Sequence, residues 1–208
     1  TLDDGDILLH RFSPTGFYSS AVRNPFLRSL EARSDRQIPY SRVPAGEPVA
    51  DLLLLAQADA GQHLEQRLFV DHAVANCKSN VLYKGALQGR NAHTVWVGDV
   101  LIRKEAEGTD TYEANRNLVL SEEAMARSIP QLEIEANEVR CTHGATVSPV
   151  EEEHLFYLMS RGIDRVTAQK LVVFGFFTDV LDRIRVPKVR DELSDAISRK
   201  VEGDQRLE

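Results

Sequence analysis

From about Val49 to Val147 the chain is a succession of short strand-like runs, among them residues 117–120 and 138–140, with no helical pattern between them. This feature limits the fold more than any other. Alternation is clear where Leu68 and Val70 share one side with His72, and where Trp96 faces away from its valine neighbours. Strands at roughly regular spacing without helices between them indicate a sandwich, a barrel or a β-solenoid.

Asparagines favour one of these architectures, because several fall where the chain would turn between runs. Asn tolerates left-handed backbone and can bond neighbouring amides at a corner. The asparagines expected at corners are Asn76, Asn80, Asn91, Asn115 and Asn117. They favour a solenoid, and the imperfect repeat leaves a sandwich as the alternative.

Beyond Val150 the spacing of apolar residues becomes helical. Three glutamates suit the start of a first helix, and Gly162 is a typical αL residue at its end. Asp164 is placed to cap a second helix that runs to about Arg185, and Gly175 inside that helix indicates close packing. A third amphipathic helix is expected over residues 191–201.

These patterns divide the chain into three regions. We expect an irregular, unassigned segment over residues 1–50, a β-helix core over residues 51–148 and a helical C-terminal domain over residues 149–208. The fold class is therefore mainly β with α.

Composition limits the function further. A net charge of -7 over 208 residues argues against a broad nucleic-acid surface, which needs a basic face. Cys77 and Cys141 form no disulfide framework, so a reduced, cytoplasmic setting is expected. Neither a membrane-spanning run nor a signal peptide is visible. The chain lacks an initiator Met, which suggests a fragment or a processed form.

One pair of residues combines metal-binding chemistry with suitable spacing. Cys141 and His143 stand two residues apart, so in an extended strand both point to the same side. Both are ligands for soft or borderline metals. A buried Cys often simply packs, and a zinc or iron site normally needs three or four protein ligands. The pair alone therefore does not establish a metal site.

No other pattern supports catalysis. The chain has no Walker-type loop and no dinucleotide fingerprint. Asp71 and His72 are adjacent, so on a strand they point to opposite sides and do not form a dyad. Glu133 and Glu135 share a face, but clustered acids on consecutive strands, as a pectin-lyase-like hydrolase would need, are missing. We expect no enzyme and assign no catalytic residue.

A set of motifs runs in a consistent order from about His63 to Ile184, at residues 69–72, 77–80, 82–85, 108–110, 115–118, 130–134, 141–146 and 155–163. Together these motifs resemble the SufB/SufD family of iron–sulfur cluster assembly proteins, in its SufD-like form. Known members are longer on the N-terminal side.

The resemblance implies a right-handed parallel β-helix followed by a C-terminal helical domain. It also implies a non-catalytic scaffold subunit of a SufBCD complex, which pairs with a SufB-like chain and docks a SufC-like ABC ATPase. Sulfur would come from a SufS/SufE donor through the complex. A homodimer of the isolated chain is a further expectation, as is a bacterial, cytoplasmic location with no nucleic-acid or membrane partner. The alternative is a structural β-solenoid adaptor without a cluster site.

The resemblance also implies site residues. His143, with Cys141 beside it, would be an interface ligand of a transient nascent iron–sulfur cluster shared with SufB. The SufC-docking region would lie on the C-terminal helices, at Leu155, Phe156, Tyr157, Arg161, Gly162, Phe174 and Phe177.

Overall fold

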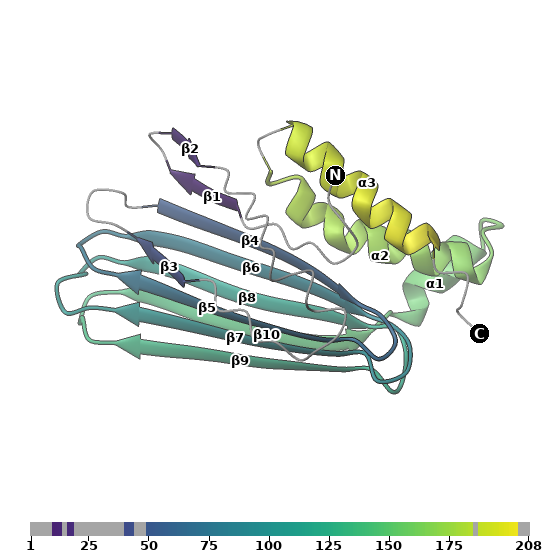
Figure 1. Cartoon of the computed structure of the whole chain (residues 1–208), viewed down its shortest axis with the longest axis horizontal. Coiled ribbons are helices and arrows are strands. Elements are labelled where there is room, and N and C mark those ends of the chain that lie inside the picture. The colour runs from purple at the N-terminus through teal and green to yellow at the C-terminus, as the bar shows by residue number, and fades with distance from the viewer. Residues whose placement is uncertain (1–9, 14–15, 19–39, 44–48, 185–186, 204–208) are drawn as a thin grey trace.

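The chain forms a flattened β-solenoid followed by three helices, as seen in a computed structural model that describes residues 10–13, 16–18, 40–43, 49–184 and 187–203 (Figure 1). The expected β-helix with C-terminal helices is therefore confirmed. The long strands, each of ten residues, are β4 Val49–Ala58, β5 His63–His72, β6 Lys78–Leu87, β7 His93–Ile102, β8 Asp110–Val119, β9 Met125–Ile134 and β10 Arg140–Pro149.

The long strands alternate between two parallel sheets, which is the arrangement of a solenoid rather than a sandwich. Even-numbered strands stack in the order β10-β8-β6-β4, and β9, β7 and β5 stack in the other sheet. The register never slips: Val49 pairs with Lys78, Lys78 with Asp110, and Asp110 with Arg140. Three coils are thus complete, and β10 begins a fourth.

The N-terminal segment, expected to be irregular, contributes three short strands. These are β1 His10–Ser13, β2 Gly16–Tyr18 and β3 Tyr40–Val43. β1 pairs antiparallel with β4, and β3 pairs parallel with β5, so both sheets are extended at the first-coil end. The rest of this segment lies outside the described residues.

The corners of the solenoid use residues that tolerate positive φ. Asn76 and Asn91 adopt φ of 60° and 61°, which confirms two of the predicted corner asparagines. Asn80, Asn115 and Asn117 instead lie within strands, so their prediction as corners was wrong. Asn115 and Asn117 are buried in the interior, where their side chains bond to each other.

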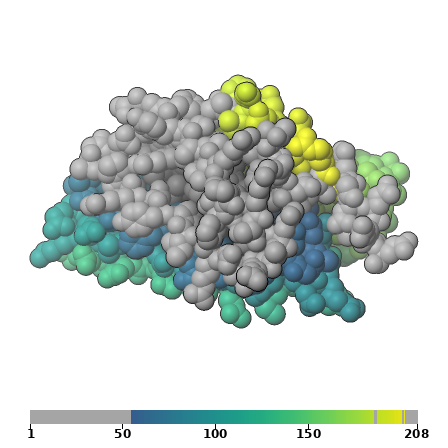
Figure 2. Space-filling view, in the orientation of Figure 1, coloured from purple at the N-terminus to yellow at the C-terminus, as the bar shows by residue number. Residues whose placement is uncertain are grey.

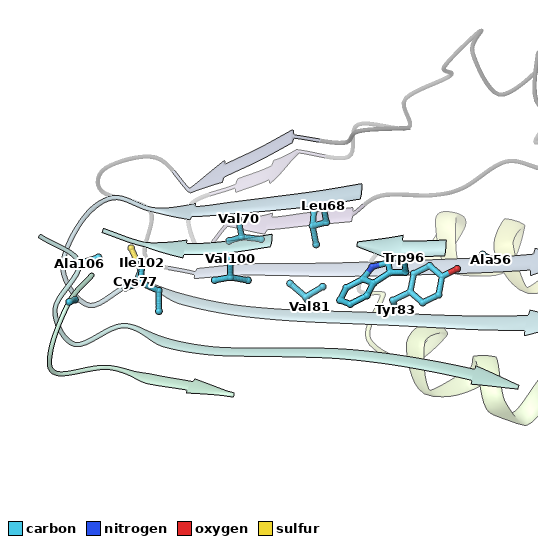
Figure 3. Packing of buried hydrophobic residues seen from close by; sticks show 11 residues of the cluster. Ala56, Leu68, Val70, Cys77, Val81, Tyr83, Trp96, Val100, Ile102 and Ala106 are labelled. Atoms are coloured by element: carbon cyan, nitrogen blue, oxygen red, sulfur yellow. The ribbon is translucent and has the colours of Figure 1, made fainter. Parts of the chain in front are cut away.

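The interior between the sheets is apolar in its first coils. Trp96 and Tyr83 pack with their ring centroids 6.0 Å apart, while Cys77, Ile102 and Ala106 gather at one end (Figure 3). All five are at most 1% exposed. This cluster is the part of the core that aligns the coils.

Three helices follow the solenoid: α1 Glu152–Met159, α2 Arg165–Leu181 and α3 Pro187–Gly203, of which α3 forms the yellow surface in Figure 2. α2 and α3 cover the outer face of the larger sheet, and α1 packs against α2. Asp164 caps α2 by accepting from the Thr167 amide, as predicted. Within the described residues, no helix is long and apolar enough to cross a membrane.

The helices pack against β6 and β8. Leu82 and Ala114 contact apolar side chains of α2 and α3, and Ala86 contacts Val173 and Phe177. β6 is consequently buried on both faces, which explains its nearly continuous burial. Gly175 was predicted to allow close packing, but a Cβ added there would meet no atom within 4 Å, so that prediction was wrong.

One buried cation fixes α2 to the solenoid. Lys84 of β6 donates to the carbonyl oxygen of Phe176 at 2.7 Å and lies 3.0 Å from the Asp179 carboxylate. Its ammonium group also sits 4.5 Å from the centre of the Phe176 ring. Burial lowers the pKa of Lys84, and the neighbouring Asp179 opposes that shift. These contacts orient the helical region on the sheet.

Candidate functional site

The last coil presents an open end of the solenoid. In the described residues β10 pairs only with β8, and β9 pairs only with β7. β9 and β10 also contact each other, so both sheets end at the same end of the molecule. Their outer edges carry backbone N–H and C=O groups that a strand of another chain could pair with. β9 has Pro130 within this edge, whereas β10 has no Pro before Pro149.

The candidate ligands Cys141 and His143 lie on this terminal strand. Cys141 is half-buried against the apolar interior, and His143 is exposed. They occupy positions two apart on a strand, so their side chains share one side, as the spacing predicts. In the β8–β10 ladder, Cys141 is paired with Thr111 and His143 with Glu113. A ligand set here is accessible from the open end.

Beneath them lies a buried carboxyl group that sequence reasoning missed. Glu113 is 1% exposed, and neither carboxylate oxygen has a hydrogen-bond partner. A Cβ added at Gly98 would clash with Glu113 Oε1, so the glycine makes room for the carboxyl group. Burial raises the pKa of Glu113 to about 7, and Asp99 adds to the shift. Burial, and then Glu113, also raises the pKa of the Cys141 thiol.

This carboxyl group predicts a pH dependence of stability. The unfolded pKa is 4.5 and the folded value is about 7, so the folded state holds an extra proton between them. The Glu113 contribution to the free energy of unfolding therefore falls by about 3 kcal/mol as pH rises from 4.5 to 7, and is flat above pH 7.

Glu113→Gln should remove this slope and stabilise the chain at pH 8. Urea denaturation of both proteins at pH 5 and pH 8 checks the prediction. A stability difference between variant and wild type that is the same at both pH values would contradict it.

A second buried polar group links successive coils behind the ligand strand. His72 Nε2 lies 3.0 Å from Ser79 Oγ, which lies 2.5 Å from Thr111 Oγ1. Burial lowers the pKa of His72 to about 4, although Asp71 opposes the shift. Asp71 points to the other side and accepts two hydrogen bonds from Arg103, as expected for adjacent strand residues.

The helical residues predicted to dock a partner differ in how exposed they are. Leu155 and Phe177 are 2% and 1% exposed and pack inside the chain, where they position the helices. Phe156 and Tyr157 are 72% and 55% exposed on α1. The Arg161 guanidinium stacks 3.8 Å from the centre of the Tyr157 ring.

The remaining residues of this set are Gly162, in the turn between α1 and α2, and Phe174, inside α2. Gly162 adopts φ of 85°, as the predicted helix end requires, and Phe174 is half-buried. Three more apolar side chains of α1 and α2 are exposed: Met159, Val166 and Leu171. We call Phe156, Tyr157, Met159, Val166 and Leu171 the helical apolar surface.

Cys141 and His143 form an incomplete ligand set on this chain. In the described part of the chain, no group of three or more Cys, His, Asp or Glu side chains is arranged to hold a metal ion. Thiolate and imidazole suit iron, and an iron–sulfur cluster commonly takes four protein ligands. Cys141 and His143 alone therefore do not complete such a ligand set.

A known family model covers most of this fold. Residues 20–176 match the family model "SUF system FeS cluster assembly, SufBD core domain". The chain belongs to the SufBD family.

Relatives of the chain carry names from the same family. The chain is 56% identical over 160 residues to an iron–sulfur cluster assembly SufBD family protein of Mycobacterium tuberculosis, covering 74% of this chain and 40% of the relative. It is 30% identical over 152 residues to the SufD of Escherichia coli, covering 73% and 36%, and 32% identical over 120 residues to that of Bacillus subtilis, covering 58% and 28%. The chain thus spans about 40% of the length of the first of these.

Proposed function

We propose that this chain is a non-catalytic, SufD-like scaffold subunit that pairs with a SufB-like chain and docks a SufC-like ATPase. The observation that carries the proposal is the open end of the solenoid, where an accessible strand presents Cys141 and His143. Family membership supports a role in iron–sulfur cluster assembly.

The unpaired strand edges support pairing with a SufB-like chain. β10 is exposed over most of both faces, unlike β6 and β8 in the same sheet. A partner strand added along β10 would satisfy its backbone groups and cover Val147, which is 49% exposed. The same edge would form a homodimer when the chain is alone.

The cluster is the cargo of such a pair and is bound transiently at the interface. His143 would supply an imidazole ligand and Cys141 a thiolate, with SufB supplying the others. Because burial raises the pKa of Cys141, forming the thiolate requires displacement of its proton by the metal. A SufS/SufE donor would supply sulfur to the complex.

The helical apolar surface supports docking of the ATPase. Exposed aromatic side chains next to an arginine are typical of the centre of a protein interface. Lys84 holds α2 on the solenoid, so force applied to the helices would reach the sheet that ends in β10.

Anaerobic reconstitution with SufB-like and SufC-like subunits tests this function. Iron and acid-labile sulfide should appear in the assembled complex in amounts that depend on this chain. The alternative, a structural solenoid adaptor, predicts a complex of the same composition whose iron and sulfide do not change when Cys141 and His143 are both replaced by alanine. That result would overturn the scaffold role.

A further inference from the structure

Two histidines of the smaller sheet, β3-β5-β7-β9, face each other at the start of neighbouring strands. His63 opens β5 and His93 opens β7, and the two residues are paired in the ladder. Their Nδ1 atoms are 3.0 Å apart, and their rings stand nearly perpendicular at 80°. Both side chains are partly exposed. They lie outside the candidate site on β10, and the family motifs noted above do not include them.

In the structure the two Nδ1 atoms form a hydrogen bond, with one ring as donor and the other as acceptor, and an ion that displaced this proton could bind both nitrogens. The ring centroids are 4.6 Å apart, clearly more than the separation of the nitrogens. We take the two rings as symmetric, with each Nδ1 about 1.1 Å from its ring centroid. The two lines drawn from centroid through Nδ1 then meet about 2 Å beyond each nitrogen. That is the length of a bond from imidazole nitrogen to a transition metal. At this length the two nitrogens subtend an angle of about 90° at the ion, typical of square-planar or octahedral coordination.

The surroundings indicate how such an ion would be held. Met125 of β9 is the next residue in the same row of the sheet and is 56% exposed, so its thioether could approach the ion. Arg127, two residues further, is close enough to act on the charge of His93, and a positive charge there weakens cation binding. The site thus combines two imidazole ligands, one nearby thioether and one positive charge that weakens cation binding.

We propose that His63 and His93 form a chelating site for a divalent transition-metal ion of the nickel and copper type, with water in the remaining positions. Such an ion would link β5 of the first coil to β7 of the second coil. Two imidazoles suit these ions, whereas tetrahedral zinc usually takes four protein ligands at a wider angle.

The test uses the tag-free chain carrying Cys141→Ser and His143→Ala, so that the candidate cluster ligands do not contribute. Isothermal titration calorimetry with Ni²⁺ at pH 7.5 should show one saturable site. His93→Ala and His63→Gln should each weaken binding by about tenfold or more, a loss of the size seen when metal sites lose a supporting group. Arg127→Gln should tighten binding. His154→Ala, which removes an exposed histidine of α1, is the matched control.

Circular dichroism confirms that each variant is folded, and two independent histidine variants guard against misfolding of either one. Binding that persists unchanged in both His63→Gln and His93→Ala overturns the proposal. Absence of saturable Ni²⁺ binding to the folded parent chain, with Cu²⁺ also failing to bind, overturns it as well.

Discussion

Phe156→Asp is expected to abolish co-purification of a SufC-like ATPase with this chain. Phe156 is 72% exposed, the most exposed member of the helical apolar surface, so the substitution removes an anchor and buries a charge in any interface formed there. Because the side chain makes little internal contact, the melting temperature should change by about 2 °C or less. The measurement is co-purification from cells that express both chains, followed by thermal denaturation of the isolated variant.

Gln131→Glu is the matched control for this prediction. It adds the same charge at an exposed position of β9, on the solenoid rather than on the helices. The control should retain the ATPase. Undiminished co-purification with Phe156→Asp would show that the helical apolar surface is not the docking site.

Trp96→Ala should cause a large loss of stability. Trp96 is 1% exposed and packs against Tyr83 in the middle of the coils. Truncation of a buried Trp typically costs about 3–5 kcal/mol. The Trp96 Nε1 atom has no hydrogen-bond partner, so the variant also loses an unfavourable buried group. We therefore expect the free energy of unfolding to fall by about 3 kcal/mol.

Trp96→Phe separates packing from polarity. Phenylalanine retains most of the ring and lacks the unpartnered N–H, so its cost should stay within about 1.5 kcal/mol. Trp96 is the only tryptophan in the chain, so urea unfolding must be followed by circular dichroism rather than by indole fluorescence. Equal losses for the two variants would contradict the view that Trp96 stabilises the core by filling volume.

The solenoid could be predicted where its interior is apolar. Leu68, Val70 and Trp96 alternate with outward residues, and the structure places all three in the core. In β8 the inward positions are Glu113 and two asparagines, so the usual alternation of apolar and polar residues is lost. For this reason the sequence pattern indicated only a short strand at residues 117–120, whereas β8 covers ten residues.

The terminal strand was underestimated for a related reason. Residues 138–140 were expected to be a strand, but β10 runs from Arg140 to Pro149. Its side chains are small and largely exposed on both faces, so burial imposes no period on them. Pairing with β8, which a local pattern does not reveal, defines this strand.

Some residues of the candidate site could be predicted from the sequence and others could not. Cys141 and His143 could be paired from the sequence, because their relation depends only on strand geometry. Glu113 and the pair His63 and His93 depend on register between coils some thirty residues apart. Only the stacked structure brings these residues together. The sequence signal that could have revealed them is a constant spacing between successive corners, which gives the register of the coils.

The most direct test of the scaffold role is the cluster content of a reconstituted complex that carries His143→Ala. His143 is exposed, so the variant should fold and assemble normally. Thr142→Ala is the matched control, because Thr142 is exposed on the opposite side of the same strand. Iron and sulfide per complex should fall about tenfold or more with His143→Ala and stay at the wild-type value with Thr142→Ala. A wild-type cluster content with His143→Ala would contradict the assignment of His143 as a cluster ligand.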